Sequence, residues 1–148
     1  MTIISLERTA DTLPADFPEL EADAKADGHA NMTRLVAEFA HDRGMFHAIF
    51  TCLLGGRLVG IGAITNEPAP TPIPMWRMRR LYVHRNHRRR KIAQAIANAL
   101  LQEAVGKVSI VTVHAGHEGA ARFWEAVGFR QVEGQPWSHE TVISTLDA

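Results

Sequence analysis

The central third of the chain constrains the fold more than any other segment. It begins with a β-rich run, Met75–His84, which leads through a basic turn into an amphipathic segment, Arg88–Val105. Ile92 and Ile96 lie on one face of a predicted helix of about eighteen residues. The nearly all-apolar run VSIVTV follows, of the kind that is buried on both faces. Strand, helix and strand form a βαβ unit, so the sequence predicts an α/β fold with a parallel strand pair and a right-handed crossover.

The flanking segments predict antiparallel strands and further helices. The clearest is a hairpin in which Phe46–Leu54 and Arg57–Thr65 are joined by Gly55-Gly56, a dipeptide that supplies the positive φ angles of a tight turn. Four prolines between residues 68 and 74 cannot join a central strand and mark a loop. The other expected elements are an edge strand at Thr2–Glu7, short helices between Pro14 and Gly28, a helix from Asn31, as its cap, to Gly44, a helix at Gly119–Ala126, and closing strands FRQV and ETVISTL.

Length and composition describe one ordinary folded domain, residues 1–148. Apolar residues make up 46% and charged residues 22% of the chain, which argues against disordered and fibrous classes. With 16 basic and 16 acidic residues, no net charge draws the chain to nucleic acid or to an anionic membrane. No segment reaches the ~20 apolar residues that span a bilayer, and the N-terminus does not look like a signal peptide. The single cysteine, Cys52, is expected in the core of a cytoplasmic protein.

The basic turn between the strand and the helix is the strongest candidate for a binding site. A helix N-terminus presents unpaired N–H groups and a partial positive charge, and here Arg88, Arg89, Arg90 and Lys91 stand beside it. Such a site suits an anion such as a diphosphate. Two other interpretations are a solvated helix start and a small nucleic-acid patch. Nucleic acid is disfavoured because no aromatic residues interleave with the arginines and the whole chain is neutral.

This turn resembles the GNAT superfamily of acetyl-CoA-dependent N-acetyltransferases, in which the motif Q/R-x-x-G-x-G/A holds the CoA pyrophosphate. The six positions of the motif are occupied by Arg88, Arg89, Arg90, Lys91, Ile92 and Ala93. The first and last positions match the motif. Lys91 stands where the family has a glycine that lets the backbone approach the phosphate.

A second stretch, HEGAARFWEAVGF, resembles the family block N-x-x-A-x-x-F-Y-x-x-x-G-F. Four residues match at the expected spacing and two are replaced: the matches are Ala120, Phe123, Gly128 and Phe129, with His117 for the asparagine and Trp124 for the tyrosine. The two motifs occur in the family's order on successive helices. The resemblance covers essentially the whole chain.

The resemblance implies a GNAT-like acyl-CoA N-acyltransferase fold, with a central twisted mixed sheet of about six or seven strands and about four helices around it. It also implies a splayed parallel strand pair that admits the pantetheine arm of acetyl-CoA, whose amides pair with backbone groups of the strand. No metal is expected. Besides the turn at 88–93, the residues that the resemblance assigns to the acetyl-CoA site are Leu81, Tyr82, Val83, His117, Ala120, Phe123 and Trp124.

Direct attack of an amine on an acetyl thioester needs a base, a stabilised oxyanion and a proton for the departing thiolate. His114 is the candidate base because it follows the apolar strand VSIVTV, with Glu67 and Glu140 as acidic alternatives. A lone histidine at a strand end also has a purely structural interpretation. Trp124 cannot give up its indole proton, so the candidate acid is either Tyr82 or water. Alternation of side chains along the strand favours water, because Tyr82 is then expected to face away from the pocket.

The sequence thus predicts transfer of the acetyl group from acetyl-CoA, as co-substrate, to a primary amine that it does not identify. The loop PAPTPIP and the N-terminal helices are expected to shape the amine pocket, since these segments vary with substrate in the family. The alternative is a catalytically inactive acyl-CoA sensor or interaction module with the same fold. No membrane or nucleic-acid partner is expected, and a homodimer stays open.

Overall fold

The structure, a computed structural model, describes residues 4–9 and 11–143. In this part of the chain seven strands form one mixed sheet in the order β1-β2-β3-β4-β5-β7-β6, flanked by four α-helices, as predicted. The strands are β1 Ile4–Arg8, β2 Phe46–Leu54, β3 Arg57–Asn66, β4 Trp76–Val83, β5 Ile110–Val113, β6 Arg130–Gln131 and β7 His139–Val142. The helices are α1 Phe17–Ala26, α2 Asn31–His41, α3 Ile92–Ala104 and α4 Glu118–Val127, with short 3-10 turns at Arg43–Met45 and Arg85–His87.

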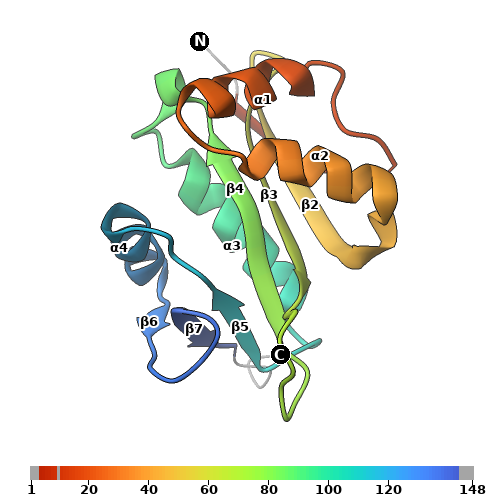
Figure 1. The fold of residues 1–148 in the computed structure, drawn as a ribbon. Helices are drawn as coiled ribbons and strands as arrows, with labels where there is room; N and C mark the ends of the chain where they lie inside the picture. The colour runs from red at the N-terminus through yellow and green to blue at the C-terminus, as the bar shows by residue number, and fades with distance from the viewer. Residues whose placement is uncertain (1–3, 10, 144–148) are drawn as a thin grey trace.

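Helices cover both faces of the sheet (Figure 1). α1 and α2 lie on the face toward the viewer, and α3 lies behind β3 and β4. Each face has its own apolar core, with Leu35 and Ile61 in the core beneath α1 and α2, and Ile64 and Ile96 in the core beneath α3. α3 packs tightly on β3 at Gly62, which has no side chain. A Cβ atom at this position would lie only 2.7 Å from Cγ2 of Ile96. β4 is the middle strand of the sheet and lies between these two layers.

The antiparallel half of the sheet agrees with the sequence prediction. β2 and β3 pair along their lengths, and Gly55 and Gly56 at the turn have φ angles of 58° and 83°, which L residues rarely adopt. β1 pairs with β2 and is the edge strand that was expected, although Thr2 and Ile3 lie outside the described residues. Cys52 is buried in the core on the α3 side, and burial raises the pKa of its thiol.

The predicted βαβ unit is confirmed, but its helix is shorter than the periodicity indicates. α3 joins β4 to the parallel strand β5 and contains 13 residues, beginning at Ile92 rather than Arg88. The reason is the backbone of the preceding turn, where Arg89 and Lys91 have φ angles of 69° and 61°. These left-handed conformations cannot continue a right-handed helix, so the turn stays outside it.

Other boundaries shift by a few residues. α2 ends at His41, and Asn31 is its first helical residue rather than its cap. β6 is only two residues long, and β7 begins at His139. The end of the predicted strand ETVISTL, residues 144–146, lies outside the described part of the chain. Within that part, no helix combines the length and the apolar character needed to cross a bilayer.

Candidate functional site

A cleft of about 560 Å³ opens beside β4. Its walls come from the start of α2, from β4 and the turn after it, from the segment that follows β5, and from α4. It is lined by His29, Asn31, Met78, Arg79, Arg80, Leu81, Tyr82, Val83, Arg88, Ala93, Val113, His114, Gly116, His117, Gly119, Ala120, Phe123 and Trp124. Most of the site residues that the sequence indicated therefore meet in one place, but Arg89, Arg90, Lys91 and Ile92 lie outside the lining.

The cleft exists because β4 and β5 separate. The two strands pair only at Trp76 with Val111 and at Arg77 with Thr112. Beyond this point β5 continues to pair with β7, whereas the described part of the chain places no strand against that side of Met78–Val83. Figure 1 shows β4 rising away from β5 and α4. The splayed parallel pair is thus confirmed, and it leaves this side of β4 without a paired strand. The Leu81 and Val83 carbonyls accept from Asn31 Nδ2 and Arg88 Nε, but each carbonyl oxygen can accept a second hydrogen bond from a ligand that lies along the strand.

A β-bulge interrupts β4 within the cleft. Ile61 pairs with Tyr82 and Ala63 with Arg79, so β4 contains one more residue than β3 between these pairs. The extra residue is accommodated at Arg80, whose φ angle is 58°. The bulge breaks the alternation of side chains, and Arg79 and Arg80 both contact Glu38 of α2. No glycine or proline marks this bulge, and sequence reasoning missed it.

Arg88 is the one arginine of the basic turn that lines the cleft. Its Nε donates to the carbonyl oxygen of Val83 at 3.1 Å, and its Nη2 donates to Asp27 Oδ2 at 2.8 Å. Arg89, Arg90 and Lys91 are exposed and lie outside the lining of the cleft. The side chain of the fifth motif residue, Ile92, is buried in the core under α3, whereas the sixth, Ala93, reaches the cleft.

A buried carboxylate, which the sequence did not indicate, holds the basic turn in place. Asp23 Oδ2 accepts hydrogen bonds from the Tyr82 hydroxyl at 2.6 Å and from the Arg85 backbone N–H at 3.1 Å, while Oδ1 accepts from Arg85 Nε at 3.1 Å. Burial acts to raise the pKa of Asp23, but the hydrogen bonds from Tyr82 and Arg85 outweigh it, and the pKa is lowered. α1 therefore fixes the end of β4 and the start of the turn.

The opposite wall is formed by the second motif on α4. His117 is the N-cap of α4, and its Nδ1 accepts a hydrogen bond from Ala120 N–H at 3.1 Å. Trp124 is buried and packs edge-to-face against Phe123 and Phe129, with ring centroids 5.0 Å and 5.2 Å apart. Phe123 and Trp124 give this wall an apolar surface, and His117 has the capping role that a histidine before a helix can play.

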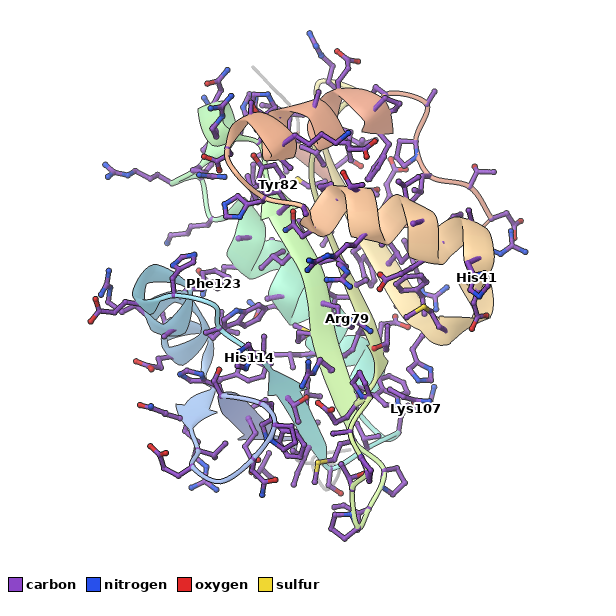
Figure 2. All side chains as sticks on the ribbon, in the orientation of Figure 1. His41, Arg79, Tyr82, Lys107, His114 and Phe123 are labelled. Carbon is purple, nitrogen blue, oxygen red and sulfur yellow. The ribbon has the colours of Figure 1, made fainter. Side chains whose placement is uncertain are left out.

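The candidate base and acid occupy different settings (Figure 2). His114 follows β5, is exposed and lines the cleft. Tyr82 also borders the cleft, but its side chain is buried under α1 and its hydroxyl is bound to Asp23. Burial and the neighbouring Asp23 raise the pKa of Tyr82 well above its ordinary value. The phenol is thus a weaker acid than a tyrosine in water.

The two acidic alternatives lie away from the cleft lining. Glu67 is buried where β4 and β5 still pair, and its Oε1 accepts from Arg77 Nε at 2.8 Å and from Thr112 Oγ1 at 2.7 Å. Glu140 on β7 accepts a hydrogen bond from Trp137 Nε1 at 3.0 Å. Both carboxylates are committed to contacts that hold strands and loops together, so His114 is the better placed candidate base.

Comparisons with known proteins agree with this geometry. The sequence profile of the acetyltransferase (GNAT) family matches residues 6–129. No curated protein matches the sequence significantly. Among solved structures, a protein of Exiguobacterium sp. 255-15 assigned as an acetyltransferase has a TM-score of 0.83 at 19% identity, covering 95% of this chain and 93% of its own.

Two further solved structures contain CoA or acetyl-CoA. YhbS, a GNAT family N-acetyltransferase from Escherichia coli in complex with CoA, has a TM-score of 0.69 at 15% identity, covering 97% of this chain and 82% of its own. The AtaTR complex bound with acetyl-CoA has a TM-score of 0.69 at 15% identity, covering 94% and 93%. At these identities the likeness shows the fold alone.

Proposed function

Because the chain belongs to the GNAT acetyltransferase family, we propose that it transfers the acetyl group of acetyl-CoA to a primary amine. The observation that carries the proposal is the cleft where β4 and β5 separate, with a basic turn and the N-terminus of α3 at its rim. The presence of CoA in YhbS and of acetyl-CoA in AtaTR, which share the fold, supports acetyl-CoA as the donor.

The residues present fit an acetyl-CoA molecule. The backbone of Leu81, Tyr82 and Val83, on the side of β4 that β5 has left, suits the two amides of a pantetheine arm. Arg88 and the N-terminus of α3 at Ala93 suit a pyrophosphate. Lys91 and the neighbouring arginines add positive charge outside the cleft lining. We assign the apolar wall of Phe123 and Trp124 to the space beside the thioester.

The chemistry needs two proton transfers. We propose that His114 takes the proton of the attacking amine, whose nitrogen forms a bond to the thioester carbon as the carbon–sulfur bond breaks. Backbone N–H groups at the bulge of β4 would stabilise the oxyanion. Tyr82 is a poor acid for the departing thiolate, because its hydroxyl already donates to Asp23 and its pKa is raised. We therefore assign protonation of the thiolate to water.

A panel of primary amines, screened for release of free CoA thiol and for acetylated product by mass spectrometry, tests the proposal. It predicts at least one amine whose acetylation depends on both protein and acetyl-CoA. Binding of acetyl-CoA without acetylation of any amine, including peptide N-termini and aminoglycosides, would contradict it and favour an acyl-CoA sensor.

A further inference from the structure

The cleft carries positive charge and, among the described residues, no carboxylate. Three arginines line it, Arg79, Arg80 and Arg88, and the lining includes neither aspartate nor glutamate. Arg88 belongs to the turn at the end of β4, whereas Arg79 and Arg80 lie at the bulge, several residues away along the strand. A plain cationic amine gains nothing from such a surface, because like charges repel. The positive charge at the bulge therefore favours a ligand that carries a negative charge over a plain cationic amine.

The arginines at the bulge outnumber the carboxylate that they share. Arg80 binds Glu38 in a bidentate manner, with Nε to Oε1 at 3.0 Å and Nη2 to Oε2 at 2.7 Å. Arg79 reaches the same Oε2 through Nη2 at 3.3 Å, which is its one side-chain hydrogen bond in the described structure. Arg34, on the turn of α2 before Glu38, is a third cation that faces this carboxylate. Two cleft arginines and one glutamate thus leave a net charge of about +1 at the bulge.

Partial burial strengthens the effect of this excess charge on a bound ligand. The side chains of Arg79 and Arg80 are only 19% and 15% exposed, so water screens them less than surface charges. Burial and the adjacent Arg80 lower the pKa of Arg79, while the Arg80 hydrogen bond lowers the pKa of Glu38. Glu38 is therefore already ionised at neutral pH. A guanidinium has five N–H donors in a planar fork that matches an anion with two oxygens, and Arg79 uses one of them on Glu38.

We propose that the acetyl acceptor is a small amine that also carries an anionic group, a carboxylate or a phosphate, and that Arg79 binds this group. The inference rests on the proposed acetyl transfer and specifies its second substrate. Arg79 and His114 line the same cleft from β4 and from the segment after β5 (Figure 2). The anion at Arg79 neutralises the excess charge of the bulge and orients the amine toward His114. A cleft of about 560 Å³, shared with the donor, suits a small acceptor.

Matched pairs of acceptors test the inference whichever amine is the natural acceptor. Each pair differs only in the anionic group: amino acids against their amides, and phosphoethanolamine against ethanolamine, which separates carboxylate from phosphate. Amino acid amides have the more easily neutralised amines, so a preference for the acid cannot come from amine reactivity. We expect kcat/KM for the anionic member of at least one pair to be about tenfold or more higher. Equal or better activity with every neutral member would overturn the inference.

Variants assign the preference to a residue. Arg79→Gln should lower kcat/KM for the anionic amine about tenfold and leave that for its neutral analogue within about twofold. Arg34→Gln is the matched control, since it removes an exposed cation near Glu38 that does not line the cleft, and it should change neither. A loss of equal size for both members of the pair would overturn the role of Arg79. If Arg79→Gln does not fold, the wild-type ratios still decide whether the acceptor is anionic.

A binding measurement separates this inference from the proposed reaction. N-acetylated amino acids and their amides can be titrated into protein saturated with CoA, with thermal stability as the readout. Stabilisation by the acids but not by the amides, lost in Arg79→Gln, supports the anion site even if no amine is acetylated. In that case the proposed transferase activity fails while the anion site stands. If only neutral amines are acetylated and the acids do not stabilise the protein, the proposed transferase activity stands and the anion site fails.

Discussion

The Arg88 guanidinium donates a hydrogen bond to Asp27 Oδ2 at 2.8 Å, so the first arginine of the basic turn is tied to the C-cap residue of α1. The same guanidinium lies over the ring of Tyr82, 5.4 Å from its centroid. The hydrogen bond from Arg88 lowers the pKa of Asp27, which is therefore a carboxylate at neutral pH. An anionic ligand at the turn competes with this carboxylate for Arg88.

Removing the competing carboxylate should tighten binding. Asp27→Asn is expected to lower the Kd for CoA by about threefold, the effect of a partly exposed ion pair, as measured by isothermal titration at fixed ionic strength. Asp42→Asn, an exposed carboxylate at the end of α2, is the control and should leave the Kd unchanged. Weaker binding by Asp27→Asn would show instead that Asp27 holds Arg88 in position.

Backbone strain at the motif glycine position gives a second prediction. Lys91 has a φ angle of 61°, so Lys91→Gly should raise the free energy of unfolding by about 1 kcal/mol in denaturant titrations. Arg90 does not have a positive φ angle, and Arg90→Gly should lower stability because glycine adds freedom to the unfolded chain. Equal losses in the two variants would mean that the left-handed conformation at Lys91 is not strained. CoA affinity of Lys91→Gly reports separately whether the ammonium group contributes to binding.

Regular patterns made much of the fold predictable. Hydrophobic periodicity located α3, Gly55 and Gly56 marked the hairpin, and the two motifs assigned Arg88 and Trp124 to one site, where both line the same cleft. These features depend on residues close together in the sequence, or on a spacing that a short window reveals.

Features that depend on long-range contacts or on unusual backbone angles were not predictable. The bulge at Arg80 and the left-handed turn residues occur at arginine and lysine, which carry no turn signal. The partners Asp23 and Glu38 lie about forty to sixty residues before the groups that they bind. They are on amphipathic helices, where the sequence pattern predicts that an acidic residue is solvent-exposed. Asn31 looked like a helix cap, but its Nδ2 donates to the Leu81 carbonyl at 3.3 Å.

Tyr82→Phe should affect stability far more than turnover. It removes a donor from buried Asp23, at an expected cost of about 1–3 kcal/mol in the free energy of unfolding at pH 7. Because the folded state lowers the pKa of Asp23, its contribution is lost as pH falls below about 4. Because the folded state raises the pKa of Tyr82, the contribution of the Tyr82 hydroxyl to stability is lost as pH rises above about 10. The difference in the free energy of unfolding between the wild type and Tyr82→Phe should therefore shrink at both low and high pH. A loss of about a hundredfold in turnover would make Tyr82 the acid after all.

His114→Ala tests the base. With the best amine from the panel, turnover should fall about a hundredfold at pH 7 and much less at pH 9.5, where more of the amine is already neutral. Phe123→Leu, a change in the apolar wall of the same cleft, should give a loss that does not vary with pH in this way. An equal loss at both pH values in His114→Ala would assign His114 to positioning or packing.

Calorimetric titration of the protein with acetyl-CoA tests the central claim most directly, because every other inference about the cleft depends on a donor bound between β4 and α4. The account predicts a single site of micromolar affinity and a matching rise in thermal stability. In Arg88→Ala, with the fold intact, the Kd should rise at least tenfold and the thermal shift should be smaller. No heat of binding and no thermal shift at millimolar acetyl-CoA would contradict it.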